Sequence, residues 1–341
     1  MLSVKKKFSH LGFSIIFYVV ISNLVSVVAM VLYVFAIVIF AVSAMESYST
    51  GEVIQAALRV MSTIDNQSAL ETIVTMLPAY LIATPLTLMI LNSGKYKDVP
   101  LKTFSFLTDY EKNEKRNLTI PEFFGFFVVA VFFGVAGSLV AAGLSYVFYL
   151  ITGIEMNNTL TSYLQNMSLP MIFFIAVILA PIFEELLYRY GVVGYSMRYG
   201  EWNAIILSAV IFGLVHTNIF QFFYAFLLGG LFAYIYIYTR QIKYTIAMHI
   251  LFNFLGAFVP LSISPDGEMT TPYMIFAVIQ YLVAITGLIV LIVNVSKGKL
   301  LKTKENAPIP GGASRDSFLN PGMITLIIVC IILTFVMQGI S

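Results

Sequence analysis

PMIFFIAVILAPIFEELLYRYGVVGYSMR, residues 170–198, is a long apolar run interrupted by two adjacent carboxylates and an arginine. A helix that crosses a bilayer needs about 20 predominantly apolar residues, and this run exceeds that length. An ionisable side chain inside such a helix costs about 2.5–3.5 kcal/mol on insertion scales, so it persists where it is paired, solvated or functional. Glu184, Glu185 and Arg189 therefore mark this segment both as a membrane span and as a candidate site.

The composition of the whole chain agrees with a membrane protein. Of the 341 residues, 59% are hydrophobic and only 11% are charged, whereas a soluble domain carries about 25% charged residues. The net charge of +2 offers no argument for a nucleic-acid partner. The single cysteine, Cys330, lies in an apolar run, so we expect no disulfide framework, no cysteine-based metal site and no cysteine nucleophile.

Nine apolar runs are long enough, or nearly so, to span a bilayer as helices. They cover roughly residues 11–44, 70–91, 122–151, 170–198, 203–217, 219–239, 243–259, 273–295 and 322–339. Most lysines and arginines fall in alternate loops of this map, which by the positive-inside rule places the N-terminus inside and the C-terminus outside. We predict an all-α, polytopic transmembrane helical bundle of about nine spans, N-in and C-out.

The charged loops divide this bundle. Residues 1–121 would hold N-terminal transmembrane helices and a cytoplasmic loop, and residues 122–295 a compact core. A polar linker rich in Pro and Gly, 296–321, would lead to a C-terminal transmembrane helix, 322–341. The first, second and ninth spans are expected to be peripheral to the core. Three small residues in the third span, Gly134, Gly137 and Gly143, would allow close helix packing.

Polar side chains are concentrated between residues 184 and 253. Besides the two glutamates, this part of the chain carries His216, His249 and Asn253, while the remaining histidine, His10, falls in the N-terminal tail. Residues four apart lie on one face of a helix, which pairs Glu185 with Arg189, Phe212 with His216, and His249 with Asn253. Glu184 is rotated by about 100° from Glu185 and lacks a partner in its own helix.

The depth of these groups in the membrane can be estimated by counting residues from the nearest turn. Glu184 lies sixteen residues before Gly200, in the expected turn, and His216 lies sixteen residues after it. At about 1.5 Å per residue, both would lie about 24 Å from the turn. His249 is close in sequence to Arg240 and Lys243, and it should therefore lie nearer the cytoplasm. We expect a cavity in the cytoplasmic half of the membrane, with helix tilt closing this gap.

Two chemistries are open to these groups. Glu184 and His216 could hold and deprotonate a water, while His249 and Asn253 donate hydrogen bonds to a developing oxyanion. Alternatively Glu184, His216 and His249 could bind Zn²⁺ with a water at an open position. The chain lacks the H-E-x-x-H helix typical of zinc proteases and the G-x-S-x-G turn of serine hydrolases. We expect no cofactor, with zinc as the alternative.

Three motifs in this order resemble one known family. Glu184-Glu185-x-x-x-Arg189, Phe212-x-x-x-His216 and His249-x-x-x-Asn253 are similar to the motifs of the CAAX-protease and bacteriocin-processing (CPBP, or Abi) family of intramembrane endopeptidases. The resemblance implies Glu184 as the general base with His216 assisting, and His249 with Asn253 as the oxyanion site. It implies that Glu185 and Arg189 shape the cavity.

We therefore expect an intramembrane endopeptidase that cleaves a peptide or membrane-associated protein, working as a glutamic protease in a bacterial cell membrane. The resemblance links such proteins to prenylated CAAX proteins, bacteriocin leaders and signalling-peptide precursors. A proton-coupled transporter or a non-proteolytic bacteriocin-immunity protein is the alternative, since buried Glu and His also serve as proton relays.

Overall fold

The computed structural model describes residues 3–43, 49–63, 69–93, 115–298 and 313–337. All regular elements in these ranges are helices. Seven stretches are long and apolar enough to cross a membrane. These stretches are α1 (Val4–Ser43), α3 (Ala69–Leu91), α4 (Ile120–Thr152), Leu169–Ser196, α10 (Ile219–Thr239), Ile242–Ile263 and α13 (Thr271–Ser296).

Two shorter apolar helices stand where the fifth and ninth spans are predicted: α9 (Glu201–Val215) and α15 (Pro321–Met337). The fold class is thus confirmed as an all-α, polytopic helical bundle, and the chain is an integral membrane protein. The count of nine spans and the N-in orientation stay predictions, because length and composition do not determine how a helix lies in a bilayer. Short helices complete the chain: α2 (Thr50–Thr63), α5 (Thr159–Gln165) and α14 (Ala313–Phe318).

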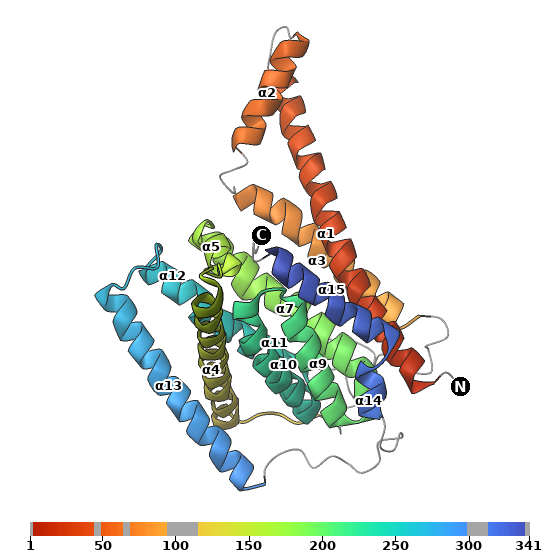
Figure 1. Cartoon of the computed structure of the whole chain (residues 1–341), viewed down its shortest axis with the longest axis vertical. Helices are drawn as coiled ribbons and strands as arrows, with labels where there is room; N and C mark the ends of the chain where they lie inside the picture. Colours follow the sequence, from red (N-terminus) through yellow and green to blue (C-terminus); the bar gives the residue numbers. More distant parts are fainter. Residues whose placement is uncertain (1–2, 44–48, 64–68, 94–114, 299–312, 338–341) are drawn as a thin grey trace.

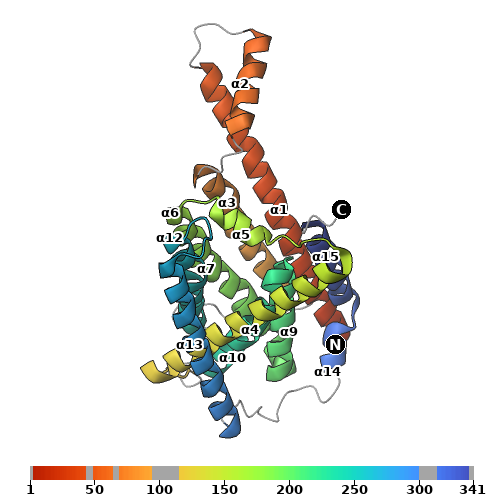
Figure 2. The same ribbon diagram turned by 60° about the vertical axis from the view of Figure 1, so that its left-hand side comes forward.

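The central helices carry the predicted site. Figure 1 shows α7, α9, α10 and α11 between α4 and α13 on one side and α1, α3 and α15 on the other, and in Figure 2 α4 crosses in front of α9 and α10. The far end of α1 projects from this body together with α2.

The segment quoted at the outset is not one regular α-helix. Two π-helices interrupt it on either side of α7, which carries both glutamates. In order, the segment consists of α6 (Leu169–Met171), π-helix η3 (Ile172–Leu179), α7 (Ala180–Glu185), π-helix η4 (Leu186–Val193), α8 (Gly194–Ser196) and the 3₁₀-helix η5 (Met197–Tyr199). The seventh predicted span likewise changes, from α11 (Ile242–Asn253) to π-helix η6 (Phe254–Phe258) and then α12 (Val259–Ile263). Such π-helical turns occur often at functional sites.

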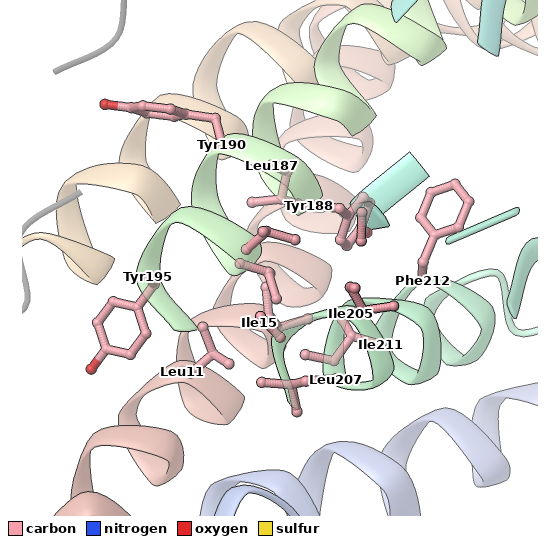
Figure 3. Packing of buried hydrophobic residues seen from close by; sticks show 14 of the residues in the cluster. Leu11, Ile15, Leu187, Tyr188, Tyr190, Tyr195, Ile205, Leu207, Ile211 and Phe212 are labelled. Atoms are coloured by element: carbon pink, nitrogen blue, oxygen red, sulfur yellow. The ribbon is translucent and has the colours of Figure 1, made fainter. Parts of the chain in front are cut away.

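Helices α1 and α15 contribute side chains to the hydrophobic core and are not peripheral as expected. Leu11 and Ile15 of α1 are fully buried and pack in one cluster with Leu187, Leu207 and Ile211 of the central helices, as Figure 3 shows. The same cluster contains Met323, Leu326 and Cys330 of α15. The division of the chain at residues 121, 295 and 321 stays a prediction.

Specific contacts hold α1 in place. The hydroxyl of Ser9 accepts a hydrogen bond from the backbone N–H of Gly322 at 3.0 Å, where a side chain on Gly322 would collide with the Ser9 carbonyl. His10 lies within α1 and not in a tail, because the helix begins at Val4; its Nε2 lies 2.9 Å from the carbonyl oxygen of Ile90 in α3. These contacts attach α1 to both α15 and α3.

Of the three glycines for which close packing is predicted in α4, two serve it. A Cβ added at Gly137 would lie 2.4 Å from the backbone of Tyr224 in α10, and one at Gly134 would lie 2.7 Å from the ring of Phe252. A Cβ at Gly143 would meet nothing within 4 Å, so the prediction is wrong for Gly143.

Gly137→Ala should therefore destabilise the protein by about 1–3 kcal/mol, because the added methyl group cannot be accommodated against backbone. Gly143→Ala is the matched control, with the same substitution in the same helix, and should leave the stability unchanged or raise it through better helix propensity by up to about 1 kcal/mol. Thermal unfolding of the two purified variants in detergent measures the difference. Equal midpoints would contradict the packing described here.

Candidate active site

The buried ion pair predicted from the sequence is present. Arg189 Nε lies 3.0 Å from Glu185 Oε2, and both side chains are fully buried. The guanidinium carbon of Arg189 lies 4.5 Å from the ring centroid of Phe212 and 5.4 Å from that of Phe232. Its two terminal nitrogens find no hydrogen-bond partner among the described residues. The two aromatic faces therefore supply much of the environment of this cation.

Glu185 has a second partner that the sequence did not reveal. His249 Nδ1 lies 2.9 Å from Glu185 Oε1. Since a carboxylate only accepts hydrogen bonds, Nδ1–H of His249 donates. Glu185 is therefore not paired with Arg189 alone. One carboxylate links the arginine of its own helix to a histidine of α11.

His249 also reaches Glu184. Its Nε2 lies 3.8 Å from Glu184 Oε2. The expected difference in depth between the two residues is therefore absent. The estimate assumed an α-helical rise throughout, but Leu186–Val193 is π-helical, and a π-helix, with its i→i+5 hydrogen bonds, places more residues in each turn. The residue count thus overstated the distance of Glu184 from the turn.

His216 is held by the end of its own helix. Its Nδ1 donates to the carbonyl oxygen of Phe212 at 2.5 Å, which leaves Nε2 unprotonated in the neutral ring. The next residue, Thr217, has a φ of 46°. A β-branched residue in the left-handed region is strained, at a cost of about 1–3 kcal/mol, and such strain is concentrated at functional sites. This strained turn ends α9 at His216 and begins α10 after Asn218.

A cavity of about 250 Å³ opens beside Glu184 and His216. The side chain of Glu184 is 20% exposed. His249 and Asn253 do not line this cavity, although His249 lies directly behind Glu184. A cavity at the predicted water-activating pair is therefore present, while its position relative to the membrane stays a prediction. Its walls are formed by Tyr18, Val19, Ser22, Asn23, Tyr80, Glu184, Tyr188, Val215, His216, Thr217 and Leu333.

Several of these wall residues were missed by sequence reasoning. Tyr188 could have been found, since it lies four residues after Glu184 on the same helix face. Ser22 and Asn23 are polar positions inside the first apolar run, which was a weaker signal. Tyr80 and Leu333 carry no local signal, because they reach the cavity only through the packing of α3 and α15.

Asn253 is hydrogen-bonded to the backbone of η3. Its side-chain amide donates to the carbonyl oxygen of Ala176 in η3 at 2.8 Å. In the i→i+5 pattern of η3 this carbonyl would pair with residue 181, which is a proline and has no N–H. Asn253 therefore compensates a backbone acceptor beside α7, and only its second amide hydrogen remains for another partner.

Phe212 lies between the ionisable groups. Its ring makes edge contacts with His216, at 4.8 Å between centroids, and with His249, at 5.9 Å. It also contacts Tyr188, at 5.0 Å. With Arg189 against its face, the ring of Phe212 packs between the two imidazoles.

A metal site is not assembled by these side chains. Across residues 3–43, 49–63, 69–93, 115–298 and 313–337, no three His, Cys, Asp or Glu side chains are placed to hold one ion. His249 Nδ1 is already bonded to Glu185, and the ring of Phe212 lies in contact with the rings of both His216 and His249. The predicted trio Glu184, His216 and His249 does not fit zinc in this arrangement, so we derive no step through a metal.

Comparison with known proteins indicates the same family as the three sequence motifs. Residues 165–255 match the family described as type II CAAX prenyl endopeptidase Rce1-like. This segment contains the two glutamates, Arg189, both histidines and Asn253. This part of the chain is similar to the CAAX-protease family.

A curated relative supports this assignment. The chain is 31% identical over 132 residues to a Bacillus subtilis (strain 168) protein named "Putative membrane peptidase YdiL". The aligned region covers 38% of this chain and 51% of the relative, so the chain spans about half the length of that relative. Among solved structures, none matches this chain.

The contribution of the buried Arg189–Glu185–His249 network to stability can be tested by removing the charge of Glu185. Glu185→Gln leaves the arginine buried without its anion and should destabilise the protein by about 3–5 kcal/mol. The double variant Glu185→Gln, Arg189→Met removes both charges and should recover a substantial part of that loss. Thermal unfolding in detergent compares the three proteins. A double variant no more stable than Glu185→Gln would contradict the role of the ion pair.

Proposed function

We propose that this protein is a member of the CAAX-protease family and an intramembrane endopeptidase of the glutamic type. The observation that carries the proposal is that Glu184, without a charge partner in its own helix, shares a cavity with His216 and has His249 behind it. One carboxylate and one imidazole thus line a space of about 250 Å³, and a second imidazole lies 3.8 Å from the carboxylate. A carboxylate with a purely structural role would be expected to pack against neighbouring side chains, with no cavity beside it.

In the proposed reaction, Glu184 and the free Nε2 of His216 hold a water at the carbonyl carbon of the substrate. Glu184 takes a proton as the water oxygen bonds to that carbon, giving a tetrahedral oxyanion. When the C–N bond breaks, the protonated Glu184 returns the proton to the leaving amine. The products are a carboxylic acid and an amine, and no covalent enzyme intermediate forms.

His249 is proposed to stabilise the oxyanion. Glu184, Glu185 and Arg189 together carry one net negative charge when ionised, and a doubly protonated His249 would neutralise it. Its Nε2–H would then be available beside Glu184, where charge develops. Asn253 is the proposed second donor, through the amide hydrogen that Ala176 does not use. The bond to Ala176 makes its contribution smaller than that of His249.

The proposed substrate is a peptide or a membrane-associated protein in a lipid bilayer, and the proposed location is a bacterial cell membrane. The relative from Bacillus subtilis supports the location. The family description includes prenylated CAAX ends, but no described residue of this chain identifies a prenyl group. Nucleic acid is not proposed as a partner.

One observation favours a second function. Arg189, Glu185, His249 and Glu184 form a continuous line of ionisable groups, and such lines serve as proton relays in transporters. Proteoliposomes distinguish the two functions. Solute uptake that depends on a proton gradient, with no peptide cleavage, would favour a proton-coupled transporter over the peptidase.

Glu184→Gln should lower kcat by about 10²–10⁴-fold, because an amide cannot accept the proton of the attacking water. The assay is cleavage of membrane-partitioning peptides by protein reconstituted in phosphatidylethanolamine and phosphatidylglycerol vesicles, read by mass spectrometry. Glu201→Gln, which changes a carboxylate that pairs with Arg240 away from the cavity, is the matched control and should remain active. Full activity of Glu184→Gln would refute the proposed role of Glu184.

Removal of divalent metals should leave cleavage unchanged, because the trio that could bind zinc is not arranged as a ligand set. Purified protein is assayed on the same peptides before and after treatment with a chelator, with metal content measured in parallel. Loss of activity on chelation and its rescue by Zn²⁺ would replace the metal-free mechanism with a zinc-dependent one.

A further inference from the structure

The wall of the cavity opposite Glu184 comes from helices outside the family segment. Tyr18, Val19, Ser22 and Asn23 belong to α1, Tyr80 to α3 and Leu333 to α15, whereas the matched segment covers only residues 165–255. We propose that this wall is the specificity determinant of the site and admits an uncharged substrate side chain next to the scissile bond. The inference rests on the proposed endopeptidase function.

The α1 part of the wall is one face of a helix. Tyr18 and Ser22 are four residues apart, as are Val19 and Asn23, so all four side chains turn toward the cavity. The next residues along the chain face outward: Val20 is 58% and Leu24 is 54% exposed. The side chains of Ser22 and Asn23 both donate to the carbonyl oxygen of Val19. Their oxygens therefore remain available as acceptors toward the cavity.

The charge of the lining limits what can enter. Apart from Glu184 and the titratable ring of His216, no lining residue can carry a charge at neutral pH. A charged substrate side chain would lose its hydration and gain no countercharge except Glu184, which the reaction needs as a base. Uncompensated burial of an ion costs several kcal/mol. The wall therefore excludes acidic and basic side chains at this position.

The size of the cavity gives a second limit. Its volume of about 250 Å³ corresponds to about eight waters at liquid density. That space accommodates the reacting water together with one substrate side chain. Val19 and Leu333 are aliphatic, so a larger residue at either position would reduce the space directly.

The wall is fixed relative to Glu184. The contacts of Ser9 with Gly322 and of His10 with Ile90 hold α1 against α15 and α3. Tyr80 stacks on Phe183, the residue before Glu184, with centroids 5.3 Å apart and an interplanar angle of 16°. A substituted wall residue would therefore act on the substrate more than on the position of the carboxylate.

The test uses full-length protein in phosphatidylethanolamine and phosphatidylglycerol vesicles. The probes are quenched fluorogenic peptides with a common apolar anchor, which differ at one position as Gly, Ala, Leu, Phe, Asp or Lys; mass spectrometry assigns the cleavage site. Wild type should cleave the Ala and Leu peptides at least about tenfold faster, in kcat/KM, than the Asp and Lys peptides. Val19→Phe should lower kcat/KM for the Leu and Phe peptides by about tenfold or more while sparing the Gly peptide.

Matched controls lie on the same helices. Val20→Phe, one residue along α1 on the outward face, should keep the wild-type profile. Leu333→Phe on α15 should reproduce the effect of Val19→Phe, with Ile332→Phe as its control, because Ile332 is 55% exposed. Retained cleavage of the Gly peptide shows that each variant is folded.

Two results separate the failure of this inference from the failure of the function. In the first result, Glu184→Gln is inactive, but Val19→Phe and Val20→Phe show the same substrate profile, or wild type cleaves the Asp and Lys peptides as fast as the Leu peptide. The wall then does not determine substrate specificity, while the proposed peptidase function stands. If wild type cleaves no peptide of the panel, or Glu184→Gln cleaves as wild type does, the proposed function fails and this inference fails with it.

Discussion

The hydrogen bond between Glu185 and His249 connects the two helices on which the site depends. Glu185 is fully buried, and a buried carboxylate is tolerated only where its charge and its lone pairs are compensated. Arg189 supplies the charge from the same helix, and His249 supplies a hydrogen bond from α11. The second bond fixes the ring of His249, so that its other nitrogen lies beside Glu184. A structural carboxylate thereby positions a group next to the proposed general base.

Aromatic packing makes this arrangement possible in a dry interior. Arg189 is enclosed by Phe212 and Phe232, and Phe212 also separates His216 from His249. A guanidinium is weakly hydrated and stacks on aromatic faces, which suits it to such an environment better than a lysine. The same ring thus contributes to the stability of the ion pair and to the spacing of the two imidazoles. Changes at Phe212 should affect both properties together.

Backbone irregularity also shapes the site. Pro181 has no N–H and cannot donate to the carbonyl oxygen of Ala176 in η3. The side-chain amide of Asn253 donates to that oxygen instead. The π-helical turns on either side of α7 change the height and direction of the glutamates relative to a regular helix. For this reason the depth estimate, which assumed a regular rise, placed Glu184 and His249 at different heights although their side chains lie 3.8 Å apart.

The sequence by itself determined the properties that depend on residues within a few turns of one another. These include the apolar runs, the i, i+4 pair of Glu185 and Arg189, the lack of a partner for Glu184 in its own helix, and the motifs that indicate the family. Only the tertiary structure decided which groups meet across helices. His249 is 64 residues from Glu185, and the bonded residues Ser9 and Gly322 are 313 apart. Such contacts depend on how helices pack, so no local pattern could show that α1 and α15 form a wall of the cavity at Glu184.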